Sequence, residues 1–210
     1  MPTLIFMGDS VTDCGHLTSG GTGYPVGLWG PGYVGLIASR LLSDRPAEAW
    51  KILNQGISGN KVVDLYARWK RDCLNLRPDI LSIMVGINDL WHEKSHQDGV
   101  EIPRYAQFYR MLLEWTRETL PGIRLVLMEP FAGLMGEVQE EWMEELAQRC
   151  QIVRELAREF EAVLVPSQEI LQQAIQEAPM EYWLVDGVHP MPPFHQRLAD
   201  AWLKATGMIQ

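Results

Sequence analysis

Residues 4–10, Leu-Ile-Phe-Met-Gly-Asp-Ser, join a short apolar run to a glycine turn and a serine. An apolar run that stops at a glycine is typical of a short buried strand. In open α/β sheets, ligands bind at the edge formed by the carboxyl ends of the strands. The stretch therefore predicts that Ser10 lies at the ligand-binding edge of a sheet, where a neighbouring base would make it a nucleophile.

Four more apolar runs of strand length follow: Lys51–Asn54, Ile80–Val85, Leu125–Met128 and Ala162–Val165. They do not alternate between apolar and polar residues, which suits strands covered on both faces of a parallel sheet. Apolar residues recur at helical spacing in the intervening ranges Tyr33–Leu42, Lys61–Leu74, Arg104–Thr119, Gln139–Phe160 and Pro193–Ala205. This alternation predicts a three-layer α/β/α sandwich with right-handed crossovers.

Stretches rich in Gly, Pro or polar residues are predicted to be loops: Gly15–Gly32, Trp91–Pro103 and Pro179–Pro193. No repeat, low-complexity tract or linker divides the chain. We therefore expect residues 1–210 to form one domain, since this length suits one sizeable core.

The composition argues against several classes of partner. With 18 basic and 27 acidic residues the net charge is -9, which disfavours a nucleic-acid ligand. The densest basic stretch, Arg68–Arg71, is balanced by Asp64 and Asp72, so we interpret it as a solvated helix face. No stretch approaches the ~20 apolar residues of a membrane span. No secretion signal is visible, and the three cysteines are widely spaced, which predicts reduced thiols and a cytoplasmic protein.

Three later segments supply partners for Ser10. Asp186 and His189 are three residues apart, so one loop can present a histidine base together with the carboxylate that orients it. Acyl transfer also needs hydrogen-bond donors that face the oxyanion. The Ser10 N–H, the Gly56 N–H and the Asn88 side-chain amide are the predicted donors. A serine, a base, an orienting acid and an oxyanion hole together predict a serine hydrolase.

These four segments resemble the SGNH (GDSL-type) hydrolase superfamily, which is named for Ser, Gly, Asn and His in four blocks. Gly8-Asp9-Ser10, Gly56, Gly86-Ile87-Asn88-Asp89 and Asp186-Gly187-Val188-His189 match the blocks in order, with Val11 in place of the usual Leu. The longer strings 54–60, 82–91 and 186–190 are similar to the branch that contains acetylxylan esterases and related carbohydrate deacetylases.

The resemblance implies a flavodoxin-like sandwich of about five parallel strands. It also implies a serine esterase that uses no metal or organic cofactor and forms an acyl-enzyme on Ser10. The expected partner is a small-molecule ester, first of all a short acyl, especially acetyl, ester of a carbohydrate. Trp91 and Trp183 are candidates to line the acyl or sugar pocket. A lysophospholipase or thioesterase with a longer acyl preference is the alternative, and a homo-oligomer stays open.

Two rival functions come from other motifs. His92-Glu93-Lys94-Ser95-His96 matches the zinc-hydrolase pattern His-Glu-x-x-His, which must be helical to bring both histidines onto one face. We expect a loop here, which disfavours a metal. Residues 30–35 match Gly-x-Gly-x-x-Gly, but no strand precedes them as a dinucleotide site requires. A silent binding module on the same fold is the remaining alternative.

Overall fold

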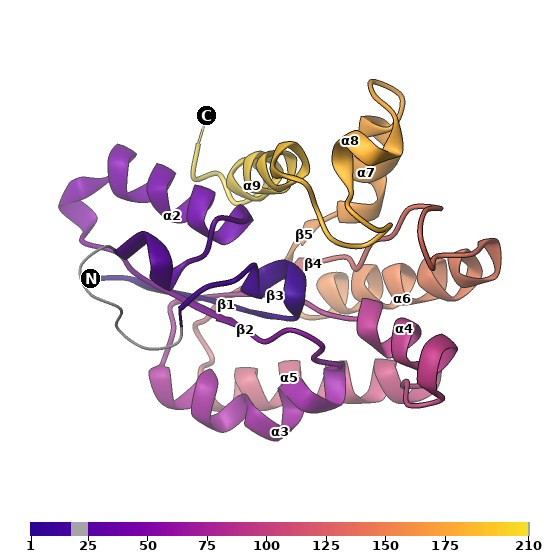
Figure 1. Cartoon of the computed structure of the whole chain (residues 1–210). Coiled ribbons are helices and arrows are strands. Elements are labelled where there is room, and N and C mark those ends of the chain that lie inside the picture. Colours follow the sequence, from indigo (N-terminus) through magenta and orange to yellow (C-terminus); the bar gives the residue numbers. More distant parts are fainter. Residues whose placement is uncertain (18–24, 210) are drawn as a thin grey trace.

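A parallel sheet forms the centre of the computed structural model, which describes residues 1–17 and 25–209 (Figure 1). Its strands are β1 (Thr3–Gly8), β2 (Lys51–Gly56), β3 (Ile80–Met84), β4 (Arg124–Met128) and β5 (Val163–Val165). They pair in the order β2-β1-β3-β4-β5, and every pair is parallel. The chain passes from β1 to β2 and then crosses to β3, so the direction of winding changes between β1 and β3. Ligands bind at such a switch point in sheets of this kind.

Helices connect the strands. They are α1 (Ser10–Asp13), α2 (Tyr33–Asp44), α3 (Val62–Asp72), α4 (Ile87–His96), α5 (Ile102–Thr119), α6 (Glu140–Glu159), α7 (Ser167–Ala174), α8 (Met180–Trp183) and α9 (Pro192–Ala205), with short 3-10 turns η1 (Pro25–Leu28), η2 (Pro46–Glu48) and η3 (Leu74–Leu76). The predicted strands and helices are all present, with ends that differ by at most two residues. The expected three-layer α/β fold is confirmed.

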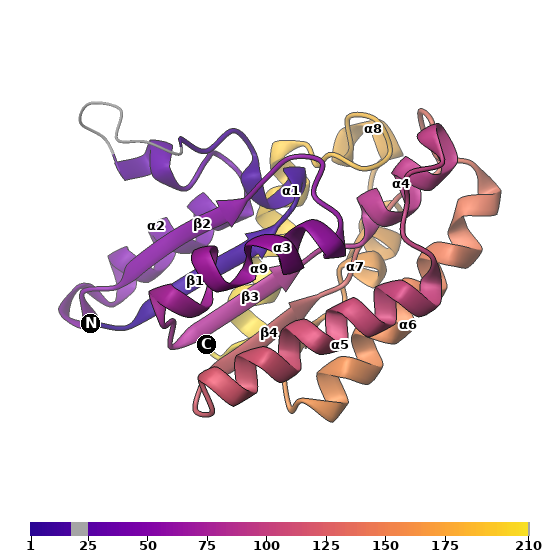
Figure 2. The ribbon, with the colours of Figure 1, turned by 90° about the horizontal axis from the view of Figure 1, so that it is seen from below.

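Two hydrophobic clusters cover the two faces of the sheet. Residues of α2, α7 and α9 pack with Leu4 and Phe6 of β1 on one face, whereas α3 and α5 pack with Ile5 and Met7 on the other. Helix α6 contributes to both clusters beside β4 and β5. Figures 1 and 2 show these layers from two directions. Successive residues of β1 point to opposite faces of the sheet, and residues 4–7 are all fully buried. This burial on both faces explains why the strand is a continuous apolar run in the sequence.

The loop predictions need correction in three places. The segment from Trp91 is not a loop, because α4 continues to His96 and α5 begins at Ile102. The Pro179–Pro193 segment includes the short helix α8, and α7 was not predicted. Residues 25–28 of the predicted first loop form η1, while residues 18–24 lie outside the described part of the chain.

The carboxyl ends of β1, β2 and β3 are level. Gly8 of β1 is in register with Gly56 of β2 and with Met84 of β3. The chain therefore leaves all three strands at one edge of the sheet, where α1 and α4 begin (Figure 2). This register brings Ser10, residues 57–60 and Asn88 to the same edge.

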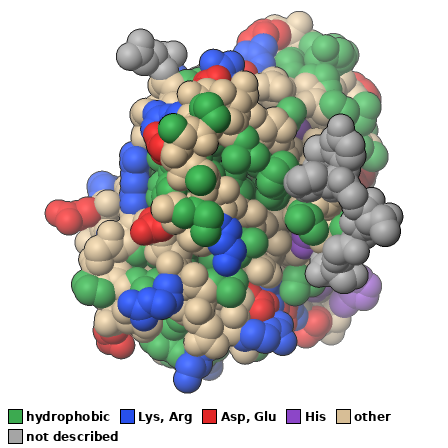
Figure 3. Space-filling model, turned by 90° about the vertical axis from the view of Figure 1, so that its left-hand side faces the viewer, with side chains coloured by type: hydrophobic (Ala, Val, Ile, Leu, Met, Phe, Trp, Pro, Cys, Tyr) green, Lys and Arg blue, Asp and Glu red, His purple; other side chains and the backbone are tan. Residues whose placement is uncertain are grey.

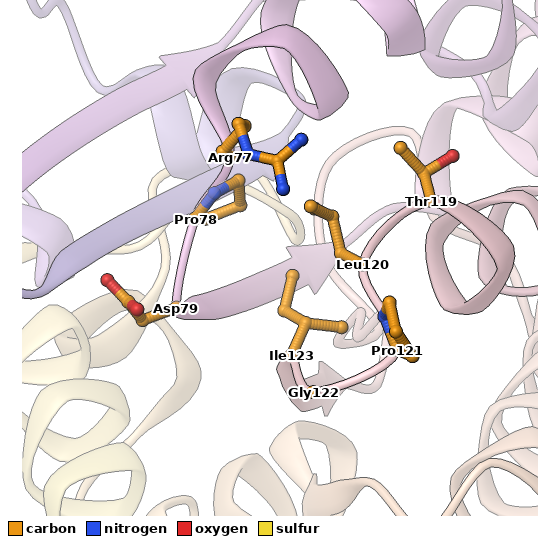
Figure 4. Close-up of a pocket in the computed structure, with 8 residues that line it drawn as sticks. All are labelled: Arg77, Pro78, Asp79, Thr119, Leu120, Pro121, Gly122 and Ile123. Atoms are coloured by element: carbon orange, nitrogen blue, oxygen red, sulfur yellow. The ribbon is translucent and has the colours of Figure 1, made fainter.

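A cavity lies at the opposite edge of the sheet (Figure 4). It is lined by Arg77, Pro78, Asp79, Thr119, Leu120, Pro121, Gly122 and Ile123. Asp79 directly precedes β3 and Ile123 directly precedes β4, so this cavity is at the amino ends of the strands. It contains none of the residues predicted to take part in chemistry.

Charged side chains of both signs are interspersed on the molecular face in Figure 3, where hydrophobic side chains gather near the middle. None of the helices in the described part of the chain is both long enough and apolar enough to span a membrane.

Candidate active site

Ser10 is held by the junction of β1 and α1. Asp9 caps α1, because its Oδ1 accepts a hydrogen bond from the Val11 N–H at 3.0 Å. Ser10 is the first residue of the helix, where backbone N–H groups have no intrahelical acceptor. The junction therefore presents the Ser10 hydroxyl and N–H together at the carboxyl end of β1.

The Ser10 hydroxyl lies next to His189. The Ser10 Oγ and the His189 Nε2 are 2.9 Å apart, and the His189 Nδ1 lies 2.6 Å from the Asp186 Oδ2. A carboxylate can only accept, so Nδ1 carries the proton and the lone pair on Nε2 faces Ser10. The side chains of Asp186, His189 and Ser10, which the sequence predicts to act together, are thus in contact in that order.

The loop before α9 fixes the acid and the base. The second oxygen of Asp186, Oδ1, accepts the backbone N–H groups of Val188 (3.0 Å) and His189 (2.9 Å). Burial alone would raise the pKa of Asp186, but these hydrogen bonds and the His189 ring lower it below its ordinary value. A β-bridge between Leu184 and Pro190 closes the base of the loop. Asp186 is therefore ionised and oriented before any substrate arrives.

The site is open to solvent. The side chains of His189 and Asp186 are 40% and 38% exposed. Both side chains are therefore accessible to water, which a hydrolytic reaction consumes.

Asn88 lies on α4 beside the turn that follows β2. Its Nδ2 donates to the backbone carbonyl of Asn60 at 3.2 Å. An amide nitrogen carries two hydrogens, so one remains for an oxyanion. Asn88 is buried, and the hydrogen bond to Asn60 orients its amide.

The Gly56 N–H is not available to an oxyanion, which corrects the sequence prediction. It donates to the Asn54 Oδ1 at 2.9 Å. A Cβ at position 56 would lie 2.2 Å from the backbone nitrogen of Asp13, so glycine is needed there for packing against α1. The close approach that the sequence suggested is real, but it involves this protein's own backbone.

Gly59 is the better candidate, and sequence reasoning missed it. Its φ of +81° favours glycine, and a Cβ at this position would have only the His92 ring within 4.0 Å. In the described part of the chain, no acceptor receives the Gly59 N–H. Asn60, the next residue, contacts Asn88. The available signal was a second glycine in the string 54–60, which spacing alone does not distinguish from the first.

The two candidate pocket tryptophans differ. Trp91 on α4 lies beside His189, and the centroids of the two rings are 6.1 Å apart. Its Nε1 donates to Glu137 at 3.0 Å, and the Trp142 ring packs edge-on against it at 5.9 Å. Trp91 is therefore a fixed aromatic wall next to the site.

Trp183 does not line the site. It is only 4% exposed, its Nε1 donates to the Ala178 carbonyl, and the Arg197 guanidinium lies 5.4 Å from the centre of its ring. Its position in the core corrects the sequence prediction, because packing rather than ligand contact explains this tryptophan.

The zinc motif is helical, contrary to expectation. His92 and His96 lie on one face of α4 with ring centroids 6.2 Å apart. Glu93 accepts the Gly99 N–H at 3.1 Å. A catalytic zinc site has three protein ligands. Within residues 1–17 and 25–209, no three His, Cys, Asp or Glu side chains are grouped to hold a metal ion. In this part of the chain the motif thus supplies two histidines without a third protein ligand grouped beside them.

Comparison with known proteins agrees with this geometry. Residues 6–197 match the model of the GDSL-like lipase/acylhydrolase family. The chain belongs to this family. It is a carboxylic ester hydrolase, as the family and its characterised relatives are.

Two proteins similar to this family member match it over almost its whole length. The acetylxylan esterase of Geobacillus stearothermophilus is 34% identical over 97% of this chain and 93% of that protein. Its crystal structure matches with a TM-score of 0.87, covering 98% of this chain and 94% of that one at 31% identity. A variant of it is described as an acetyl-xylooligosaccharide esterase. A candidate GDSL-like lipase from Parabacteroides merdae matches with a TM-score of 0.94 at 38% identity, covering 99% and 96%.

Asp9, next to Ser10, has a raised pKa. Burial, and less strongly the nearby Asp89, raise the pKa of Asp9 to about 7 from an ordinary 3.8. The folded protein keeps this proton up to about pH 7, whereas the unfolded chain releases it near pH 3.8. Raising the pH through this window therefore favours unfolding.

We expect Asp9→Asn to remove this pH dependence, because asparagine has no proton to lose and its Oδ1 still accepts the Val11 N–H. The melting temperature of the variant, relative to wild type, should rise from pH 4 to pH 7 and then level off. Thermal unfolding followed by circular dichroism measures this difference. A constant difference across that range would contradict the assignment.

Proposed function

We propose that this protein is a serine esterase that removes acetyl groups from carbohydrates, with Ser10 as nucleophile, His189 as base and Asp186 as orienting acid. The observation that carries the proposal is the chain of contacts from Asp186 through His189 to Ser10, at 2.6 and 2.9 Å. A serine hydroxyl is a weak nucleophile until a neighbouring base takes its proton, and this arrangement supplies that base.

The reaction proceeds in two halves. As the Ser10 Oγ attacks the ester carbonyl, its proton passes to the His189 Nε2, and Asp186 stabilises the resulting imidazolium. The tetrahedral intermediate collapses when His189 protonates the alcohol, which leaves an acetyl group on Ser10. Water then gives a proton to His189 and attacks the acyl-enzyme. Acetate departs, and the proton returns from His189 to Ser10.

Three donors are proposed to stabilise the negative oxygen: the N–H groups of Ser10 and Gly59 and the Nδ2 of Asn88. They come from three different strand ends, which the register of the sheet brings to one edge. Removing one donor of this kind typically lowers turnover by about 100–1000-fold.

The acetyl preference and the carbohydrate alcohol are supported by the relatives, of which one is an acetylxylan esterase. Trp91 is consistent with a sugar ligand, because an amphipathic aromatic side chain offers an apolar face beside His189. Acetylated xylo-oligosaccharides are therefore our first choice of substrate.

An acyl-chain-length series tests the proposal. We expect p-nitrophenyl acetate to be hydrolysed with a kcat/KM at least ~10-fold above that of the octanoate. A single extra methylene group in an apolar pocket can already change kcat/KM by a factor of about this size. Acetate release from acetylated xylobiose, followed by NMR, measures the sugar ester directly. A preference for eight or more carbons would favour a lysophospholipase or thioesterase instead.

A further inference from the structure

Arg68 is a buried charge close to the candidate site. It lies on α3, and only 8% of its surface is exposed. The sequence interpretation of residues 68–71 as a solvated helix face is therefore wrong for Arg68, although Arg71 has a side chain that is 76% exposed. A charged side chain is rarely buried unless its hydrogen bonds are satisfied, so the contacts of Arg68 need an explanation.

Each nitrogen of the Arg68 guanidinium has its own acceptor. The Nε donates to the Asn60 Oδ1 at 2.8 Å, the Nη1 to the Asp72 Oδ2 at 3.1 Å, and the Nη2 to the Gly8 carbonyl at 3.3 Å. Asp72 compensates the charge. The other two acceptors belong to segments that carry proposed oxyanion donors, since Gly8 lies shortly before Ser10 and Asn60 directly follows Gly59.

Gly8 lies two residues before the nucleophile. Its carbonyl accepts both the Arg68 Nη2 and, at 3.0 Å, the backbone N–H of Ile57. The end of β1 and the turn 57–60 are thus connected directly and through Arg68. Any shift of this turn relative to β1 would break both hydrogen bonds.

Asn60 connects the same turn to the third donor. Its side chain accepts from Arg68, and its backbone carbonyl accepts the Asn88 Nδ2 at 3.2 Å. Gly59, whose N–H is free in the described part of the chain, directly precedes it. Fixing Asn60 therefore fixes the directions of the N–H of Gly59 and the amide of Asn88.

We infer that Arg68 is a positioning residue that holds the Ser10, Gly59 and Asn88 donors in the arrangement needed to bind the oxyanion. The inference rests on the proposed function, because it presupposes acyl transfer to Ser10. Arg68 touches neither substrate nor Ser10 itself. It acts through Gly8 and Asn60, and its planar fork reaches three acceptors in different directions, which a lysine ammonium on this backbone does not reproduce.

The test compares Arg68→Gln and Arg68→Lys with Arg71→Gln. Arg71 is a matched control because it also binds Asp72, at 2.6 and 3.0 Å, but makes no hydrogen bond to Gly8 or Asn60. The assays are kcat and KM for p-nitrophenyl acetate, inhibition by phenylboronic acid, and thermal unfolding. The boronate adduct of a serine is tetrahedral and anionic, so its affinity reports on the oxyanion donors.

We expect both Arg68 variants to lose about 10–100-fold in kcat, with KM changed less than about 3-fold. Misplaced oxyanion donors stabilise the transition state less well, whereas they contribute little to binding of the substrate in its ground state. Affinity for phenylboronic acid should fall in proportion to kcat. For Arg71→Gln, we expect kcat, KM and the affinity for phenylboronic acid to stay within about 2-fold of the wild-type values. A folded Arg68 variant with unchanged kcat and unchanged boronate affinity would overturn the inference.

If neither Arg68 variant folds, Asn60→Ala decides the question. It removes only the acceptor of the Arg68 Nε and keeps the backbone carbonyl that binds Asn88, so a lower kcat at constant KM supports the inference and unchanged kinetics overturn it. Ser10→Ala is measured in parallel. Full activity in Ser10→Ala removes the proposed function and this inference with it. Loss of activity in Ser10→Ala, with unchanged kinetics in the Arg68 variants, removes this inference alone.

Discussion

Ser10→Ala should reduce kcat for p-nitrophenyl acetate by at least about 10⁴-fold. Alanine has no oxygen to attack the carbonyl, while His189 and the oxyanion donors remain in place. Some activity above the uncatalysed rate should persist, because donors that bind the transition state still act on attack by water. The Ser10 side chain has a hydrogen bond only with His189 in the described structure, so the variant should fold with nearly unchanged stability.

Ser43→Ala is the matched control, because Ser43 is exposed on α2 and lies outside the candidate site. Both proteins should give the same circular dichroism spectrum and similar melting temperatures. A folded Ser10→Ala protein that keeps a tenth or more of the wild-type rate would contradict the proposed nucleophile. Equal loss in both variants would show that the assay does not report on Ser10.

The second large effect concerns the two residues on the loop before α9. His189→Ala should be as damaging as Ser10→Ala, since the serine then has no base. Asp186→Asn should retain roughly 10–100-fold more activity than His189→Ala, because the imidazole persists. Asparagine can offer an N–H to the Nδ1, which places the ring proton on Nε2, where it faces Ser10 and blocks proton transfer.

Steady-state kinetics of His189→Ala, Asp186→Asn and the double variant measure this order. Residues that act as one unit are not additive, so the double variant should resemble His189→Ala alone. Asp186→Asn at the wild-type rate would leave Asp186 with only its role of closing the loop through its bonds to Val188 and His189. Multiplicative effects of the two changes would indicate independent roles.

The sequence was a good guide to the sheet because buried parallel strands leave a strong signal. Continuous apolar runs such as 4–7 and 125–128 are long enough for a strand and too short for a helix. Helix α4 was missed for the opposite reason. Its second half, from His92, is mostly polar and solvent-exposed, so no apolar stripe marks it. At the start of the helix, Asn88 donates to the Asn60 carbonyl and Asp89 accepts the Val62 N–H at the first residue of α3, and neither contact can be read from the sequence.

Within the site, chemistry-bearing side chains were easier to predict than backbone donors. Ser10, Asp186 and His189 are recognisable by residue type and order, and the folded chain brings them into contact. The choice between Gly56 and Gly59 depends on which N–H already has an acceptor, and that follows from the folded position of Asn54. No spacing rule contains this information.

Arg68 shows the same limit for charged residues. In sequence, Arg68 and Arg71 are equivalent members of one basic stretch with acidic neighbours. One turn of α3 separates a side chain buried against Gly8 and Asn60 from one exposed to water. Helical periodicity predicts that the two side chains lie near each other, but burial depends on how α3 is set against the end of β1.

The bridge between Leu184 and Pro190 encloses both Asp186 and His189, and His189 lies 179 positions after Ser10. During synthesis, every strand of the sheet leaves the ribosome before this loop does. Without this loop, the Ser10 hydroxyl at the end of β1 has no base beside it. The proposed active site is therefore complete only when one of the last-synthesised segments of the chain is in place.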